Sequence, residues 1–425
     1  MAESLAAHLA GLIDNISQIA NTAESDARRN LLNALRQAQQ EAAANGVQIP
    51  DGASGAEIAA ALGNLRAGDA VAEAIGIREI AGDAPYEEFD PHWAESLLNY
   101  YRTGKNRTPF RLHSDSTPAI DPVRQLVAAP SIRIAIAGDW GTGAAAALAV
   151  ADQIKKLDPH YTIHLGDVYY SGLPEEEQQK FLASWPPGSE GEYTLNSNHE
   201  MYCGGAGYFK TLLDAQRFRK SQQGLSYFAL SNEHWLIVGL DTAYFAYYQS
   251  LLYENGSLFE PDARREPKGM AQLEWFVALL ARHSGKRVIL LTHHDGFDVH
   301  PVTGAVTPKP LYAQVTGAMS AVHDWWWYWG HVHAGIAYER IFFANNAAMT
   351  ARCVGHGAIP YLPWMRNLEK LGDGTVRVAW AETDLARNGG DARRAPNGFL
   401  MLTLSGAELH EQFYDELGRV RWSNF

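Results

Sequence analysis

The sequence predicts an α/β fold preceded by a helical N-terminal region, and three observations support this prediction. An apolar, β-branched run at residues 132–137 has the length and composition of a buried strand. Residues 144–157 are rich in alanine and can form a helix, and residues 161–165 form a second apolar run. Strand, helix and strand in this order make a right-handed βαβ unit with parallel strands. Strand-like and helical segments continue to alternate toward the C-terminus.

The composition is that of an acidic globular protein. The 425 residues, 46% of them hydrophobic and 20% charged, provide for one large domain and a smaller one. The formal net charge of −13 disfavours broad contact with phosphate backbones, so we expect no nucleic-acid partner. Cys203 and Cys353 offer no disulfide framework, which favours a reducing compartment. The N-terminus has no basic signal-peptide region and no window is long enough to span a bilayer, so we expect a cytoplasmic protein without a membrane partner.

Residues 1–105 are predicted to be helical. Apolar residues recur at helical spacing from Leu5 to Ile19, and Asp90-Pro91 has the pattern of an N-cap followed by proline at the first helical position. Because no cluster of histidines, cysteines or acids has ligand spacing there, we expect a bundle that packs on the main domain or forms a homo-oligomer. Residues 106–130 contain four prolines and are predicted to be a linker, which leaves residues 131–425 as the main domain.

Further segments are predicted along the main domain from their apolar runs and periodicity. Strands are expected at residues 192–196, 225–230, 235–240, 287–292, 325–329, 336–344, 375–383, 398–404 and 408–414, and a helix at residues 269–283. The strands after residue 336 are expected to be antiparallel.

Asp139 and Asp167 each follow a glycine at the end of a strand of the βαβ unit. Both carboxylates should therefore emerge at the carboxyl edge of neighbouring parallel strands, where open α/β sheets hold their ligands. Two carboxylates at one edge repel each other unless a cation lies between them. This is the first indication of a metal site. Asp241 also ends a strand, and we interpret it as a structural residue.

Five short blocks with metal-ligand chemistry follow apolar strands in a fixed order. They are Gly138-Asp139-Trp140-Gly141, Gly166-Asp167-Val168-Tyr169-Tyr170, Asn198-His199-Glu200, His293 and Gly330-His331-Val332-His333. Each block alone has an ordinary interpretation as a helix cap, a turn or a packed side chain. In this order they resemble the motifs of the calcineurin-like metallophosphoesterases and, within them, the purple acid phosphatases. The resemblance covers roughly residues 131–350.

The resemblance implies a four-layer α-β-β-α sandwich of two mixed sheets that carries two metal ions. The implied ligands of the first metal are Asp139, Asp167, Tyr170 and His333. The implied ligands of the second metal are Asp167, Asn198, His293 and His331. Carboxylate and phenolate oxygens suit Fe(III), whereas imidazoles and an amide oxygen suit a divalent Fe, Zn or Mn ion. Gly141 stands where many relatives place a histidine ligand, which is the reason to give that role to Tyr170.

Other histidines are candidates for contact with the substrate. His199 resembles the family's substrate-contacting histidine, which would stabilise the transition state. His294 and His300 follow the ligand His293, and either can protonate the leaving alcohol, although an ordinary exposed histidine is an equal alternative for both. His356 ranks below these candidates. Two departures from the family pattern stand out. Ser197 replaces a common glycine, and His293 is followed by His-Asp-Gly where a proline is frequent, so His294 is an alternative ligand.

These observations lead us to expect a binuclear metal-dependent phosphomonoesterase whose partner is a small phosphoester. Metal-bound hydroxide would attack phosphorus directly. A phosphodiesterase built on the same site is the alternative. A noncatalytic interaction module that works through the helical region is a third interpretation, and retention of the full ligand pattern argues against it.

Overall fold

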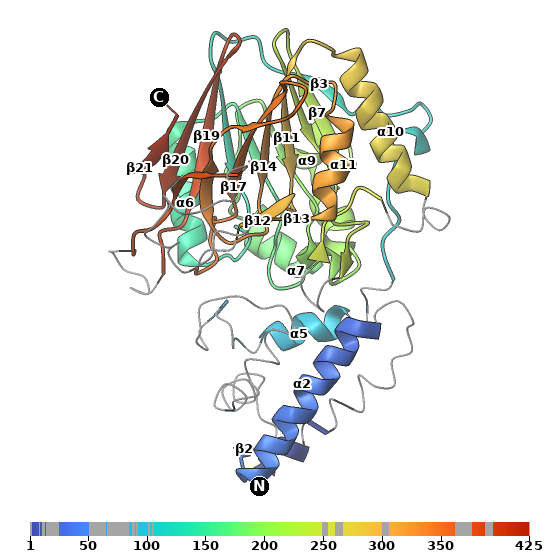
Figure 1. Cartoon of the computed structure of the whole chain (residues 1–425), viewed down its shortest axis with the longest axis vertical. Coiled ribbons are helices and arrows are strands. Elements are labelled where there is room, and N and C mark those ends of the chain that lie inside the picture. The colour runs from blue at the N-terminus through green and yellow to red at the C-terminus, as the bar shows by residue number, and fades with distance from the viewer. Residues whose placement is uncertain are drawn as a thin grey trace. The chain divides into compact units, whose positions relative to one another are not determined.

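The computed structural model describes most of the chain (Figure 1). The residues outside the description are 1, 8, 11–12, 14–24, 51–64, 66–84, 87–89, 91, 101–102, 104–105, 249–253, 260–266, 300–305, 362–375, 387–393 and 425. The chain divides into two compact units. Unit 1 comprises residues 1–105 and 247–255, and unit 2 comprises residues 106–246 and 256–425.

Unit 1 contains two described helices, α2 (Ser25–Ala44) and α5 (His92–Asn99). Helix α2 buries Leu35 and Ala38 on one face, as the helical spacing predicts. Asp90 accepts a 3.1 Å hydrogen bond from the backbone N–H of His92, which is the predicted N-cap interaction at α5.

Two short antiparallel ribbons in unit 1 were not predicted. Strand β1 (Ala2–Ser4) pairs with β2 (Gln48–Pro50), and β9 (Tyr247–Tyr248) pairs with β10 (Glu254–Asn255). The role of this unit as a separate helical domain stays a prediction.

A six-stranded mixed sheet in unit 2 has the order β21-β20-β19-β4-β5-β6. Its strands are β4 (Ile132–Ala137), β5 (Tyr161–His164), β6 (Gly191–Thr194), β19 (Gly398–Ser405), β20 (Glu408–Asp415) and β21 (Val420–Ser423). Strands β4, β5 and β6 are parallel, and α6 (Ala145–Leu157) connects β4 to β5, so the predicted βαβ unit is present. Strand β21 was not predicted.

The second sheet has nine strands in the order β18-β15-β17-β14-β11-β8-β7-β3, with β16 paired to β17. They are β3 (Val123–Gln125), β7 (Phe228–Ser231), β8 (Trp235–Gly239), β11 (Arg287–Thr292), β14 (Asp324–Trp329), β15 (Gly335–Tyr338), β16 (Ile341–Phe342), β17 (Ala348–Val354) and β18 (Val378–Ala381). Strands β8, β11, β14 and β17 run parallel. Strand β3 lies within residues 106–130, so part of the predicted linker is a strand of this sheet.

Helices and one further hairpin complete unit 2. The helical elements are η2 (His113–Asp115), α7 (Pro174–Glu176), η3 (Glu177–Leu182), α8 (Asn198–Met201), η4 (Tyr208–Leu212), α9 (Gln216–Gln222), α10 (Pro267–Arg282) and α11 (Pro310–Ala318). The hairpin pairs β12 (Phe297–Val299) with β13 (Val306–Pro308).

Alternating side chains on the strands place each sheet between two apolar cores. On β11, Ile289 and Leu291 belong to one buried cluster together with Ile134 and Leu402 of the other sheet. Val288 and Leu290 of β11 belong to a second cluster, which also contains side chains of α6, α10 and α11. Because strand residues point alternately to opposite faces, the first cluster fills the space between the sheets and the second lies under the helices. The predicted α-β-β-α sandwich of two mixed sheets is confirmed.

Candidate metal centre

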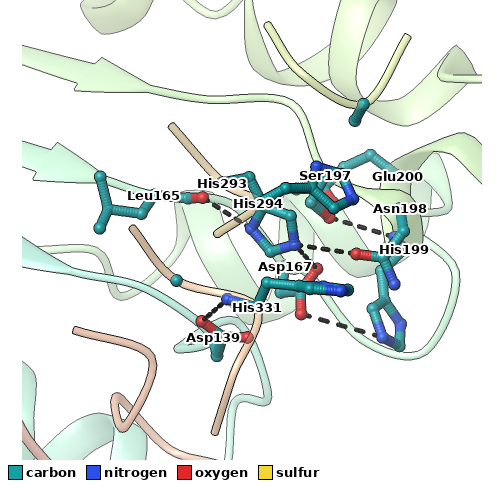
Figure 2. Close-up of polar contacts among 12 residues, drawn as sticks. Asp139, Leu165, Asp167, Ser197, Asn198, His199, Glu200, His293, His294 and His331 are labelled. Carbon is teal, nitrogen blue, oxygen red and sulfur yellow. Dashed lines mark hydrogen bonds and ion pairs between the residues drawn. The ribbon is translucent and has the colours of Figure 1, made fainter. Parts of the chain in front are cut away.

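Most of the ligands predicted from the sequence gather where parallel strands of the two sheets end, and Figure 2 shows Asp139, Asp167, Asn198, His293 and His331 among them. Asp139 follows β4, Asp167 follows β5, and Asn198 begins α8 just after β6. His293 follows β11, and His331 lies just after β14, two residues before His333. Both sheets thus direct the carboxyl ends of their parallel strands to one place, which is the expected position of a ligand site in such sheets.

Several of these residues have a strained backbone. Seven described non-glycine residues have a positive φ, and three of them are Asp139 (56°), Asp167 (79°) and His331 (62°). The left-handed region is unfavourable for residues with a Cβ, and such strain is concentrated at functional sites. The main chain therefore turns sharply at each strand end and directs these side chains toward one another.

Gly141 allows the first two loops to approach closely. Its N–H donates to the Asp167 carbonyl at 3.0 Å, and its carbonyl accepts from the Tyr169 N–H at 3.0 Å. A Cβ added at this position would lie 2.6 Å from the Asp167 carbonyl oxygen. A histidine at position 141 would therefore push the two carboxylate-bearing loops apart. The lack of a side chain at Gly141 thus permits the close approach of the loops, and it also leaves this position without a metal ligand.

The tyrosine beside the carboxylates is Tyr169, and this differs from the prediction of Tyr170. The Tyr169 hydroxyl donates to Asp167 Oδ2 at 2.8 Å and lies 3.0 Å from His333 Nε2. His333 Nε2 is in turn 3.2 Å from Asp139 Oδ1. The ring of Tyr170 instead lies beside Lys180, whose Nζ is 4.9 Å from the ring centroid. The spacing along the sequence could not show which of two adjacent tyrosines turns inward.

His293 shows most directly that this cluster is built for a cation. Its Nδ1 lies 2.8 Å from the Leu165 carbonyl, which can only accept, so Nδ1 carries the proton. In the neutral ring Nε2 then has a lone pair, yet it faces the Asn198 amide oxygen at 2.8 Å and Asp167 Oδ1 at 3.3 Å. The Asn198 amide nitrogen donates to the Tyr202 hydroxyl at 2.8 Å, and the amide oxygen points to His293. Three electron-pair donors facing one point are a metal-ligand set.

Burial decides the charges of this cluster. Desolvation and the neighbouring Asp167 raise the pKa of Asp139 well above its usual value. Desolvation also tends to raise the pKa of Asp167, but the positive fields of His199 and His293 outweigh it and hold that pKa below the usual value. Desolvation is the largest cause that lowers the pKa of His293, and the neighbouring Asp167 acts against it. When these imidazoles are neutral, as metal ligands must be, the buried carboxylates lack compensating positive charge, which a metal would supply.

Two overlapping groups of residues meet the distance requirement for holding an ion. In one, donor atoms of Asp139, Asp167 and His293 all lie within 4.8 Å of one another, and in the other those of His293, His294 and His331 do. Asp167 Oδ1 accepts no hydrogen bond from the part of the chain that the structure describes. The residues present therefore fit the two metals that the sequence implies, and the individual ligand assignments stay predictions.

The predicted substrate-contacting histidines lie in different environments. His199 Nδ1 is 2.8 Å from the Tyr170 carbonyl, and its Nε2 is 3.8 Å from Asp167 Oδ2, so the ring lies beside the cluster. His294 is fully buried, with Nδ1 3.0 Å from the Thr242 hydroxyl, so a role as proton donor to a leaving alcohol has no support. His300 lies outside the described residues. His356 is buried and packs against Phe413, which indicates a structural role.

Two further residues, Asp241 and Ser197, hold the site in place, and the structural role interpreted for Asp241 agrees with its contacts. Asp241 accepts hydrogen bonds from the Asn196 amide at 3.1 and 3.2 Å and from the backbone of Tyr244 at 2.9 Å, and so fixes the loop that leads to Asn198. Ser197 caps α8 by accepting from the His199 N–H at 3.1 Å, and its hydroxyl donates to Glu200. In the sequence, these supporting roles are indicated only by the position of Asp241 at a strand end and by the serine at position 197 in place of a common glycine.

Comparison with known proteins agrees with this geometry. Residues 132–335 match the family model described as calcineurin-like phosphoesterase. Comparison with curated protein sequences gave no match. Among solved structures, the chain is similar to a purple acid phosphatase from yellow lupin (Lupinus luteus), with 16% identity, a TM-score of 0.46, and coverage of 69% of this chain and 53% of the lupin chain. It is also similar to GAP50, the anchor in the inner membrane complex of Plasmodium, with 12% identity, a TM-score of 0.46, and coverage of 69% and 88%.

The structural similarities are too distant to carry an argument about activity, and the chain spans about half of the lupin enzyme (53%). The family model and the arrangement of the site carry the classification. Residues 132–335 are therefore classified as a calcineurin-like phosphoesterase domain. Within the described residues, no helix is long and apolar enough to cross a membrane.

Proposed function

We propose that this domain is a binuclear phosphomonoesterase similar to the purple acid phosphatases. The observation that carries the proposal is the position of His293 Nε2, which faces the oxygens of Asn198 and Asp167 while Nδ1–H is engaged by the Leu165 carbonyl. Asp167 also contacts Tyr169 with its second oxygen, so its two oxygens reach toward both ends of the cluster. A carboxylate in that position suits a bridge between two ions.

In this proposal, Asp139, Tyr169 and His333 would hold one ion, Asn198, His293 and His331 would hold the other, and Asp167 would contribute to both. When bound, the ions supply a nucleophile derived from water and neutralise the phosphoryl oxygens. His199 is held by the Tyr170 carbonyl at Nδ1, so Nδ1 carries a proton and Nε2 is directed to the Asp167 side of the site. In its protonated form His199 would donate a hydrogen bond from Nε2 to a phosphoryl oxygen.

We further propose that the ion beside Tyr169 is Fe(III). A phenol among buried carboxylates becomes a hard phenolate ligand once an ion replaces its proton, and hard oxygen donors favour trivalent iron. Imidazoles and an amide oxygen on the other side favour a divalent Fe, Zn or Mn ion. The free, buried thiols of Cys203 and Cys353 favour a reducing compartment such as the cytoplasm.

The test combines metal analysis with a substrate panel. We expect the purified protein to hold two metals per chain, to lose hydrolysis of aryl phosphomonoesters on chelation, and to regain it on reloading. Full activity after complete removal of metal would contradict the proposal. Aryl phosphodiesters form the second arm, because faster cleavage of diesters than of monoesters would assign the site to a phosphodiesterase.

A further inference from the structure

His294 is a buried histidine whose environment points to a ligand. It is fully buried, and its Nε2 has no hydrogen-bond partner among the residues that the structure describes. Burial without a partner is unfavourable for a polar atom, so such an atom in a native site calls for an explanation. The ring centroid lies 4.9 Å from that of His293 and 4.6 Å from that of His331.

The hydrogen bonds around His294 fix its position. The Thr242 hydroxyl oxygen accepts from the His294 backbone N–H at 3.3 Å and lies 3.0 Å from Nδ1. The His294 carbonyl accepts from the Thr292 hydroxyl at 2.7 Å. The Thr242 hydroxyl can accept a hydrogen bond from Nδ1–H, and in that tautomer Nε2 holds a lone pair and is the remaining ligand atom.

We propose that His294 is a third imidazole ligand of the ion held by His293 and His331. Donor atoms of these three side chains lie within 4.8 Å of one another, which satisfies the geometry of a shared ion. The proposal rests on the proposed binuclear function and deepens it. Three imidazoles shift the preference of this position away from Mg and Ca and toward Zn, Co or Fe in the divalent state.

The test uses full-length protein reloaded with Co(II). In proton NMR, each imidazole bound to Co(II) gives a strongly shifted, exchangeable N–H signal. We expect such signals from His293, His294, His331 and His333 in the wild type, and the loss of one signal in His294→Gln. The second Co(II) should bind about 10- to 100-fold more weakly in this variant, measured by competition with a chromophoric chelator. Thr242→Val should retain the signal of the His294 ring but shift it.

His356→Gln is the matched control, because this histidine is also buried but packs against Phe413. It should leave the Co(II) spectrum unchanged. A wild type that binds two Co(II) ions yet shows signals from only three imidazoles would overturn the inference without any variant having to fold. A His294→Gln protein with the wild-type signals would do the same. A wild type that takes up no Co(II) would overturn both this inference and the proposed function.

Discussion

Two clusters of buried charged residues in unit 2 are satisfied in opposite ways. Between the sheets, Arg352 of β17 and Glu411 of β20 form a bidentate pair at 2.9 and 2.8 Å, and the Tyr328 hydroxyl donates to Glu411 at 2.8 Å. At the strand ends, the buried carboxylates of Asp139 and Asp167 have only imidazoles as their nearest basic groups among the described ion-pair contacts: His333 at 3.2 Å, His293 at 3.3 Å and His199 at 3.8 Å. The first cluster balances its charge within the protein, whereas the second has an excess of electron-pair donors.

This difference separates a structural ion pair from a binding site. A buried charge is tolerated when an opposite charge and hydrogen bonds replace its water, as around Arg352. Among the described residues, the ion-pair contacts of Asp139 and Asp167 are to histidines rather than to an arginine or lysine, and donor atoms of Asp139, Asp167 and His293 converge on a common point. In the proposed function a cation would complete its charge balance, so substitutions in this cluster should reduce metal binding and activity more than they reduce stability.

The largest effect is expected from Asp167→Asn. Because Asp167 is placed to contact both ions, its amide should lower metal content and reduce hydrolysis of aryl phosphates by at least about 10³-fold. Metal analysis and initial rates measure these effects. Asp158→Asn, at an exposed carboxylate, is the control and should behave as wild type. Unchanged rates in Asp167→Asn would remove the bridging role.

The converse test is Glu411→Gln. This change leaves the buried Arg352 guanidinium without its counter-charge, so the free energy of unfolding should fall by about 3–4 kcal/mol. Urea unfolding measures the loss. Metal content per folded chain should stay at the wild-type level. Asp324→Asn, in the exposed pair with Arg340, should cost less than about 1 kcal/mol. A Glu411→Gln protein that folds normally but loses its metals would break the distinction between the two clusters.

His164 provides a test of a buried group that stays neutral. Desolvation lowers its pKa to about 3 in the folded protein. Because the unfolded state then binds the proton more tightly, stability is fully present above about pH 6.5 and is lost as the pH falls toward 3. Between pH 7 and pH 5, the free energy of unfolding of the metal-free wild type should fall by about 2 kcal/mol more than that of His164→Gln. Identical pH slopes in urea unfolding would contradict this assignment.

The smallest effect on rate is expected from the tyrosine pair. If Tyr169 binds Fe(III) as a phenolate, the iron-loaded protein should absorb visible light, and Tyr169→Phe should bleach it with a rate loss of about tenfold. Tyr170→Phe should retain the colour, since that ring lies against Lys180. The reverse result would restore the assignment made from sequence spacing. A colourless wild type that holds ferric iron would exclude a phenolate ligand.

The sequence predicted the parts of the fold that rest on continuous apolar runs. Strand β11 was predicted at residues 287–292 with the observed bounds, and the βαβ unit was predicted because each of its segments has one clear period. Strand β17 was missed because Arg352 interrupts its apolar pattern, and its partner Glu411 lies far away in the sequence. Strand β3 was missed because its three residues owe their conformation to pairing with β7.

For the site, the order of the motifs predicted which residues meet, but not how they turn. The gathering of Asp139, Asp167 and His293 follows from strand ends that share one edge, which the sequence shows. The choice between Tyr169 and Tyr170 depends on the path of a turn held by Gly141, and the path of this turn produces no periodic pattern in the sequence. The same holds for His294, whose direction is set by Thr242 from a distant loop.

The left-handed conformations of Asp139, Asp167 and His331 have a consequence for the history of such a chain. At each position glycine would relieve the backbone and favour the folded state. Selection for expression or heat resistance alone should therefore enrich glycine at these positions, whereas selection for turnover should exclude it. Deep sequencing of a mutant library under the two regimes would show the opposite preferences, and would identify the active centre without a substrate.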